Sequence, residues 1–307
     1  MEHDKEHHHH EHVGKLTSLN TSFIIGIVLN FLFVIVEFGV GLYSSSLGLL
    51  SDAGHNLSDV ASLMLAMLAF RLMSVHPNSR YTYGYKKSTV LVSLLNAVLL
   101  LIAVGLIFSS SIEKLVNPVQ VKGDMVAWTA GVGVIINAVT AWLFVKDKDR
   151  DLNVKGAFLH MVADTLVSVG VVISGIVIQY TGWMIIDPII GIAIAVVIVI
   201  STWGMLRDSL RLSLDGVPVG IDVSKIKGLL LKQNGVINCH HLHIWALSTT
   251  DTALTVHLLI KDMNKMDEIK HTVKDVLKEA GINHCTLEFE PEGFVCNDCC
   301  DGYGCND

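Results

Sequence analysis

The sequence predicts an α-helical membrane protein with six transmembrane helices and a C-terminal α+β cytoplasmic domain of the ferredoxin-like type, with the element order α-β-β-α-β. Two observations support this prediction. The 307-residue chain is 51% hydrophobic and has a mean hydropathy of +0.53, which is too apolar for an ordinary soluble protein. From Asp222 onward, however, charged and polar residues become frequent, so the last part of the chain is expected to be soluble.

Six stretches are apolar over the roughly 20 residues that a helix needs to cross a bilayer. They lie at residues 19–43, 47–73, 88–112, 124–146, 152–180 and 184–206. The start of the chain lacks the basic region, short apolar core and cleavage site of a signal peptide, so we expect the first stretch to remain as a helix. We therefore expect four parts: a His-rich cytoplasmic tail (1–18), a transmembrane domain (19–206), a cytoplasmic domain (207–290) and a Cys-rich tail (291–307).

The distribution of lysine and arginine predicts that both termini are cytoplasmic, because loops rich in these residues stay on the cytoplasmic side. Basic residues cluster between the second and third stretches, between the fourth and fifth, and after the sixth. On the other side, Lys114 and Lys122 are the only ones. The short loops favour a bacterial inner (plasma) membrane, with a eukaryotic organelle membrane as the alternative. The net charge of −7 argues against a nucleic-acid partner.

Two of the apolar stretches contain the same ionisable pair, a histidine followed four residues later by an aspartate. The pairs are His55 with Asp59, in "HNLSD", and His160 with Asp164, in "HMVAD". An ionisable side chain at the centre of a bilayer costs at least about 2.5–3.5 kcal/mol, and residues four apart project from one face of a helix. Two such helices that face each other would therefore bring four possible metal ligands together.

Two neutral histidines and two carboxylates form a tetrahedral set whose charge matches one divalent cation, and this set suits Zn²⁺. Without the metal the carboxylates must be protonated or hydrated, so metal binding and proton release are coupled. The alternative is that each pair only joins helices by hydrogen bonds, but its repetition in a second helix favours a metal site. Asp52 is either a further carboxylate of this site or an interface residue, whereas we expect Glu37 and Asn137 to form helix-packing hydrogen bonds.

The soluble part is predicted to contain two helices and three strands. They are a helix over 222–235, strands at 236–248 and 252–260, a helix over about 265–280, and a strand at 284–290. On the first strand, alternation places His240 on one face with Leu242 and Ile244, and His241 on the other face with His243. His257 is then expected near His240 across the hairpin.

Four segments resemble, in the same order, the cation diffusion facilitator family and particularly its zinc-transporting branch. They are "LLSDAGHNLSDVASL", "RYTYGYKKST", "NVKGAFLHMVADTLVSVG" and "HHLHIW", and the similarity covers about residues 15 to 290. The resemblance implies that the transported ion binds to His55, Asp59, His160 and Asp164, a set similar to the zinc-selective version. It also implies that His240, His257 and Glu290 hold a regulatory zinc ion, that the cytoplasmic domain forms a homodimer, and that Lys87 pairs across the dimer with Asp215.

The Cys-rich tail contains a further candidate for metal binding. Cys296 and Cys299 form a CxxC pair, which in a reducing compartment is typical of half a zinc site. We expect His284, or histidines of the N-terminal tail from either protomer, to complete it. The N-terminal tail, with His3, His7 to His10 and His12, need not fold and is interpreted as a tether that gathers metal.

These features predict a zinc exporter that exchanges cytoplasmic Zn²⁺ for protons by alternating access, with the lipid bilayer and a second copy of the chain as its partners. We find no P-loop, GxSxG or HExxH motif, so neither an enzyme nor a dependence on ATP is expected. The alternative is a membrane-anchored zinc sensor or scaffold with a structural intramembrane metal site. Cadmium, cobalt and nickel remain possible transported ions on the same ligands.

Overall fold

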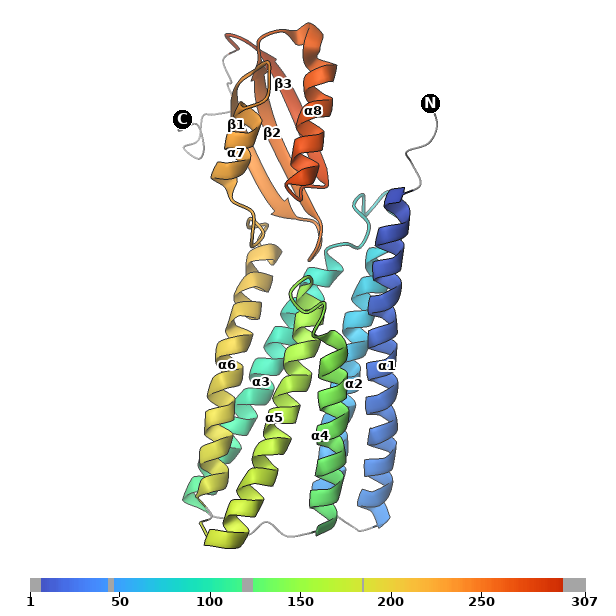
Figure 1. The fold of residues 1–307 in the computed structure, drawn as a ribbon, viewed down its shortest axis with the longest axis vertical. Helices are drawn as coiled ribbons and strands as arrows, with labels where there is room; N and C mark the ends of the chain where they lie inside the picture. The colour runs from blue at the N-terminus through green and yellow to red at the C-terminus, as the bar shows by residue number, and fades with distance from the viewer. Residues whose placement is uncertain (1–6, 44–46, 118–123, 184, 295–307) are drawn as a thin grey trace. The chain divides into compact units, whose positions relative to one another are not determined.

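A computed structural model describes residues 7–43, 47–117, 124–183 and 185–294 of the chain. The chain divides into two compact units (Figure 1). The first holds the described residues up to His76 together with Leu91–Arg207, and the second holds Pro77–Val90 together with the described residues from Asp208 onward.

Six long helices account for most of the first unit. They are α1 (His7–Tyr43), α2 (Leu47–Met73), α3 (Ser88–Val116), α4 (Asp124–Phe144), α5 (Leu152–Thr181) and α6 (Ile186–Ser213). The predicted stretches coincide with them, with two differences. Helix α1 begins within the segment for which no fold was expected, and α6 continues to Ser213 instead of ending near residue 206.

Three stretches of the described residues are long and apolar enough to cross a membrane, namely Thr21–Val40, Ser88–Val116 and Pro188–Ser213. A shorter apolar stretch, Gly131–Phe144, lies in α4. Helices α2 and α5, which carry the two pairs of histidine and aspartate, are not among these stretches of the described residues. The number of six membrane crossings therefore stays a prediction.

Helix α5 takes part in both apolar clusters of this unit. The first cluster joins α1, α2, α4 and α5, with Phe23 of α1 at its centre: its ring centroid lies 4.8 Å from that of Phe144 and 5.6 Å from that of Phe70. The second joins α5 to α3 and α6 through Ala163. Gly170 lets α5 approach α6 closely, because a Cβ atom there would lie 2.6 Å from Ile194. Helix α5 thus packs against both groups of helices.

The second unit contains the helices α7 (Val223–Leu231) and α8 (Met266–Glu279), the short 3₁₀ helix η1 (Met263–Lys265), and the strands β1 (Val236–Ala246), β2 (Thr252–Ile260) and β3 (His284–Pro291). The predicted order α-β-β-α-β is observed. In the sheet, β2 lies between β1, to which it is antiparallel, and β3, to which it is parallel. Residues of α7 and α8 form one apolar core with the strands, and Asp222 caps α7 by accepting hydrogen bonds from the backbone of Ser224 and Lys225.

A β-bulge in β1 overturns the predicted faces of its histidines. His240 pairs with His257 and His243 with Thr255, so two residues of β1, His241 and Leu242, lie opposite the single residue Val256. Leu242 and Ile244 pack against the apolar core. The prediction that they share a face with His240 was therefore wrong, because the extra residue interrupts the alternation.

Residues 77–90 belong to the second unit because several bonds join them to its other elements. Lys87 Nζ lies 2.6 Å from a carboxylate oxygen of Asp215 and also donates to the backbone carbonyls of Leu212 and Ala246. Lys86 pairs with Asp251 at 2.9 Å, and the backbone N–H of Thr249 donates to the Thr89 hydroxyl. The pair of Lys87 and Asp215 was expected across a dimer, whereas the structure forms it within one chain.

Candidate metal sites

Asp59 of α2 and His160 and Asp164 of α5 form the first group of possible metal ligands. One ligand atom from each lies within 4.8 Å of the other two. His160 Nε2 is 2.6 Å from Oδ1 of Asp59 and 3.8 Å from Oδ2 of Asp164. The spacing of four residues places His160 beside Asp164 on one face of α5, and the packing of α2 against α5 adds Asp59, which is only 1% exposed.

This geometry brings together three of the four residues that the paired motifs predicted. His55 lies in α2 one turn before Asp59, but its side chain falls outside the described residues, and so does that of Asp52. Two carboxylates and an imidazole nitrogen in a buried setting can bind a divalent cation, because the two negative charges balance the metal.

A hydrogen bond joins α2 to α1 through Asn56, a residue of the "HNLSD" motif, and Glu37. Asn56 Nδ2 donates to Oε2 of Glu37 over 2.7 Å, and the Glu37 side chain is fully buried. The helix-packing hydrogen bond predicted for Glu37 is therefore confirmed, with a partner that the sequence analysis missed although it lies inside the "HNLSD" motif. For Asn137, the side-chain oxygen has no hydrogen-bond partner among the described residues, so the bond predicted there is not observed.

A small cavity lies beside His160. Its volume is about 10 Å³, which is close to the space of a single water molecule. Asn96 of α3 contributes a buried side-chain oxygen that has no hydrogen-bond partner in the part of the chain that the structure describes. The lining residues include three polar side chains, Ser62, Asn96 and His160, together with Leu63, Leu99, Gly156 and Ala157. No sequence pattern indicates this cavity, because it depends on the packing of three helices.

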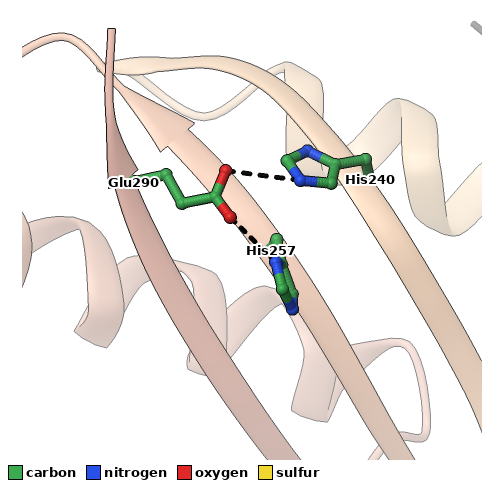
Figure 2. Close-up of side chains that lie close together, drawn as sticks. All are labelled: His240, His257 and Glu290. Carbon is green, nitrogen blue, oxygen red and sulfur yellow. Dashed lines mark hydrogen bonds and ion pairs between the residues drawn. The ribbon is translucent and has the colours of Figure 1, made fainter. Parts of the chain in front are cut away.

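The second group of possible ligands lies on the sheet and takes one residue from each strand. His240 of β1 and His257 of β2 are register partners, and Glu290 of β3 pairs with Leu259, two residues beyond His257 on the same face. Both imidazoles point toward the Glu290 carboxylate (Figure 2). His257 Nδ1 lies 2.8 Å from Glu290 Oε1, and His240 Nε2 lies 3.3 Å from Glu290 Oε2.

Two atoms of this group are in a setting that favours a bound cation. His240 Nε2 and Glu290 Oε2 are buried, and apart from their own ion-pair contact neither has a hydrogen-bond partner within the described ranges. Buried polar atoms of this kind are uncommon in folded proteins, and a metal ion between them would satisfy both. Glu288, which is 64% exposed, adds a carboxylate 3.3 Å from His257 Nε2. The predicted proximity of His257 and His240 is confirmed.

His284, a further predicted ligand, is not brought to this group. His284 is exposed and lies at the opposite end of β3 from Glu290. At the usual rise of a strand, the two residues are roughly 20 Å apart. Its ring lies edge-on to Tyr83, with centroids 5.3 Å apart. Cys296 and Cys299 lie outside the described residues, as do the side chains of the N-terminal tail.

Two other cysteines lie in the described part of the second unit. Burial raises the pKa of the Cys239 thiol, an effect that the Lys227 ammonium partly offsets. Burial likewise raises the pKa of the Cys285 thiol, with Lys274 acting in the opposite direction. Both thiols therefore stay protonated at neutral pH, and neither is a ready thiolate ligand.

One group of possible metal ligands among long apolar helices and another on a small sheet are typical of a membrane protein that handles metal ions. Comparison with known proteins identifies its family. The chain belongs to the cation diffusion facilitator family, in the zinc-transporting branch: the profile described as the cation efflux transmembrane domain matches residues 23–212, and that of the cation efflux protein, cytoplasmic domain, matches residues 218–292. The resemblance seen in the sequence is confirmed, and with it a helical transmembrane domain followed by a cytoplasmic domain that contains a small sheet.

Individual relatives are similar over nearly the whole chain. A Bacillus subtilis (strain 168) protein named cadmium, cobalt and zinc/H(+)-K(+) antiporter is 34% identical over 292 residues, which are 93% of this chain and 92% of the relative. The zinc transporter ZitB of Escherichia coli (strain K12) is 33% identical over 273 residues, 87% of this chain and 86% of its own. The cation efflux system protein CzcD of Alcaligenes sp. (strain CT14) is 32% identical over 289 residues, 92% of this chain and 89% of its own.

Proposed function

We propose that this protein is a zinc exporter, which exchanges cytoplasmic Zn²⁺ for external protons by alternating access. The observation that carries the proposal is the meeting of Asp59, His160 and Asp164 where α2 packs against α5. The relatives named as zinc transporters and as a cadmium, cobalt and zinc/H(+)-K(+) antiporter support it. We place the protein in a bacterial inner membrane, with six crossings and both termini in the cytoplasm.

The ligand set explains how zinc and protons exchange. Zn²⁺ bound to Asp59 and Asp164 leaves no net charge, and His160, together with His55, supplies nitrogen ligands that favour zinc. When the ion leaves, two carboxylates remain buried among apolar helices, and this arrangement is unfavourable unless protons or water reach them. Protons and zinc therefore compete for the same atoms, so protons that arrive from outside release the ion there.

We propose a regulatory role for the second group. His240, His257 and Glu290 would hold a zinc ion in the cytoplasmic domain of a homodimer, and this domain would have the ferredoxin-like topology. Because its strands are joined by hydrogen bonds, the group is suited to hold an ion and to report its presence. Zinc bound there would favour the transport-competent arrangement of the dimer.

The test is zinc flux into proteoliposomes that hold a fluorescent zinc indicator, with an imposed pH gradient. The intact protein is compared with Asp164→Asn, which keeps the shape of the side chain and removes its charge. Asp149→Asn, at an exposed position in the loop after α4, is the matched control. We expect flux that follows the gradient in the intact protein and the control, and background flux in Asp164→Asn.

One result would overturn the proposal. Asp59, His160 and Asp164 are called the membrane group below. If the folded intact protein binds zinc but moves none under any gradient, the membrane group is a structural site, and the protein is a membrane-anchored sensor or scaffold. The same vesicles define the range of ions, because cadmium, cobalt and nickel can replace zinc in the assay. We expect cadmium and cobalt to be carried with zinc, as in the name of the Bacillus subtilis relative.

A further inference from the structure

The backbone of His241 has an unusual conformation next to His240, His257 and Glu290, which are called the sheet group below. Its φ angle is +49°, in the left-handed region that only a few per cent of non-glycine residues adopt. His241 is also one of the two residues that oppose Val256 in the β-bulge, and the other, Leu242, faces the apolar core. Strained backbone of this kind persists where the surrounding structure holds it, and it is concentrated at functional sites.

The bulge brings the His241 ring to the face that carries the sheet group. Its ring centroid lies 4.9 Å from that of His257 and 5.3 Å from that of His240, and the centroids of His240 and His257 are 5.2 Å apart. The planes of these three rings are inclined to one another by 43° to 60°, so they are not stacked. The three imidazoles therefore form a nearly equilateral triangle.

This triangle has the size that one zinc ion requires. Imidazoles that bind a tetrahedral zinc through nitrogens at about 2.1 Å have ring centroids about 5 Å apart. All three observed separations are close to this value. The ligand atoms already within 4.8 Å of one another belong to His240, His257 and Glu290, so the His241 ring would have to turn to bring a nitrogen to a common ion.

We propose that His241 is the fourth protein ligand of the sheet group, which then surrounds one Zn²⁺ with three imidazole nitrogens and the Glu290 carboxylate. This inference rests on the proposed zinc site of His240, His257 and Glu290. Four protein ligands make a closed tetrahedral site of the structural kind, with no open position for water or substrate. The site is then complete within one chain and needs neither the N-terminal histidines nor a residue from a second protomer.

His243 is the natural comparison residue on the same strand. Its side chain is exposed, and its ring centroid is 6.4 Å from that of His241. It pairs with Thr255, two positions along β2 from His257, so it lies beyond the bulge. A histidine that merely raised the local concentration of zinc would act equally well at either position.

The experiment measures zinc affinity by chelator competition on the full-length protein in detergent, in an Asp164→Asn background that removes the membrane group. His241→Gly is the decisive variant, because glycine adopts positive φ without strain and the fold is kept. We expect it to bind zinc at least 10–100-fold more weakly, the loss typical of removing even a supporting residue of a metal site, and to melt no earlier than the parent without metal. His243→Gln is expected to bind as the parent does.

Visible absorption of Co²⁺ serves as a second readout, because the bands of a tetrahedral site should weaken in His241→Gly and remain in His243→Gln. Unchanged zinc affinity in His241→Gly would overturn the proposal. Deletion of residues 1–12 is the second test. If it lowers the zinc affinity as much as His240→Ala does, the N-terminal tail supplies the fourth ligand and the proposal is overturned. If His240→Ala itself binds zinc as the parent does, the sheet site is absent and the regulatory role fails as well.

Discussion

The two ligand groups differ in the structure that holds them. Asp59 meets His160 and Asp164 across two helices, α2 and α5, which touch through side chains. His240, His257 and Glu290 stand on three strands that are hydrogen-bonded to one another along their length. Helices that pack through side chains can slide by small steps, whereas a shift between strands breaks a ladder of backbone bonds. The membrane group can therefore come apart and re-form, and the sheet group is built to stay together.

They also differ in charge. With Zn²⁺, the two carboxylates of the membrane group leave no net charge, whereas the single carboxylate of the sheet group leaves one positive charge. Loss of the ion therefore leaves two negative charges in the first case and one in the second. Release of the metal ion is coupled most strongly to proton binding where more negative charge must be compensated. The membrane group is therefore suited to transport zinc, and the sheet group to retain it.

Asp59→Asn is the change expected to separate the two groups most completely. It removes one of the two negative charges of the membrane group at a buried position, so we expect proton-driven zinc flux to fall to background, at least about 100-fold. Loss of a residue that only supports a metal ligand typically costs about 10–100-fold, and loss of a ligand itself should cost more. Zinc bound by the sheet group should remain, which the metal content of the purified protein would show. A variant that still transports at a tenth of the normal rate would contradict the role of Asp59.

Glu290→Gln makes the complementary change on the sheet. We expect its zinc affinity at the sheet group to fall by about 10–100-fold, while flux at saturating zinc stays within about tenfold of that of the intact protein, because the membrane ligands are untouched. Equilibrium binding and proteoliposome flux on the same preparation check both parts. If flux falls as far as in Asp59→Asn, the two groups belong to one route and the contrast between them is wrong.

Asn96→Leu sharpens the description of the membrane group. The Asn96 oxygen is buried at the cavity beside His160, and its hydrogen bond to an ordered water there would contribute about 0.5–1.5 kcal/mol. Replacing the amide by leucine should therefore weaken the apparent zinc affinity measured from flux, by up to about tenfold, without affecting the sheet group. Leu99→Met, on the same cavity wall, is the control. Equal affinities in the two variants would show that the amide has no part in binding.

The smallest effect is expected from Asn56→Leu, which removes the hydrogen bond to Glu37. Hydrogen bonds between membrane helices contribute about 0.6 kcal/mol on average, so the free energy of unfolding in detergent should fall by about that amount. The sheet group should bind zinc as before. A loss of several kcal/mol would indicate that this pair is part of the ligand region and not only a link between α1 and α2.

The repeated motif predicted the membrane group because one helical turn fixes which residues share a face. Only the pairing of α2 with α5 had to be supplied by the fold. The positions of the strands followed from their composition, and so did the meeting of His240 and His257.

The environment of His241 could not be predicted in this way. One extra residue in β1 reverses the faces that alternation assigns, and nothing in the composition of "NCHHLHIWA" marks where the bulge falls. The resemblance predicted the pair of Lys87 and Asp215, but not that it forms within one chain or that Lys87 also donates to Leu212 and Ala246. These contacts join segments 125 to 159 residues apart in sequence. Both depend on long-range geometry and not on local pattern.

The small cavity beside His160 has a consequence for what else crosses the membrane. With room for about one water molecule, it is far too narrow for an ion surrounded by its hydration shell. We expect zinc to shed its water before it binds beside this cavity, so ions that hold their shells firmly, such as magnesium, should be disfavoured. The cavity also holds too little water for the continuous file along which protons hop. We therefore expect little proton leak through it between transport cycles, which would preserve the gradient that drives the exchange.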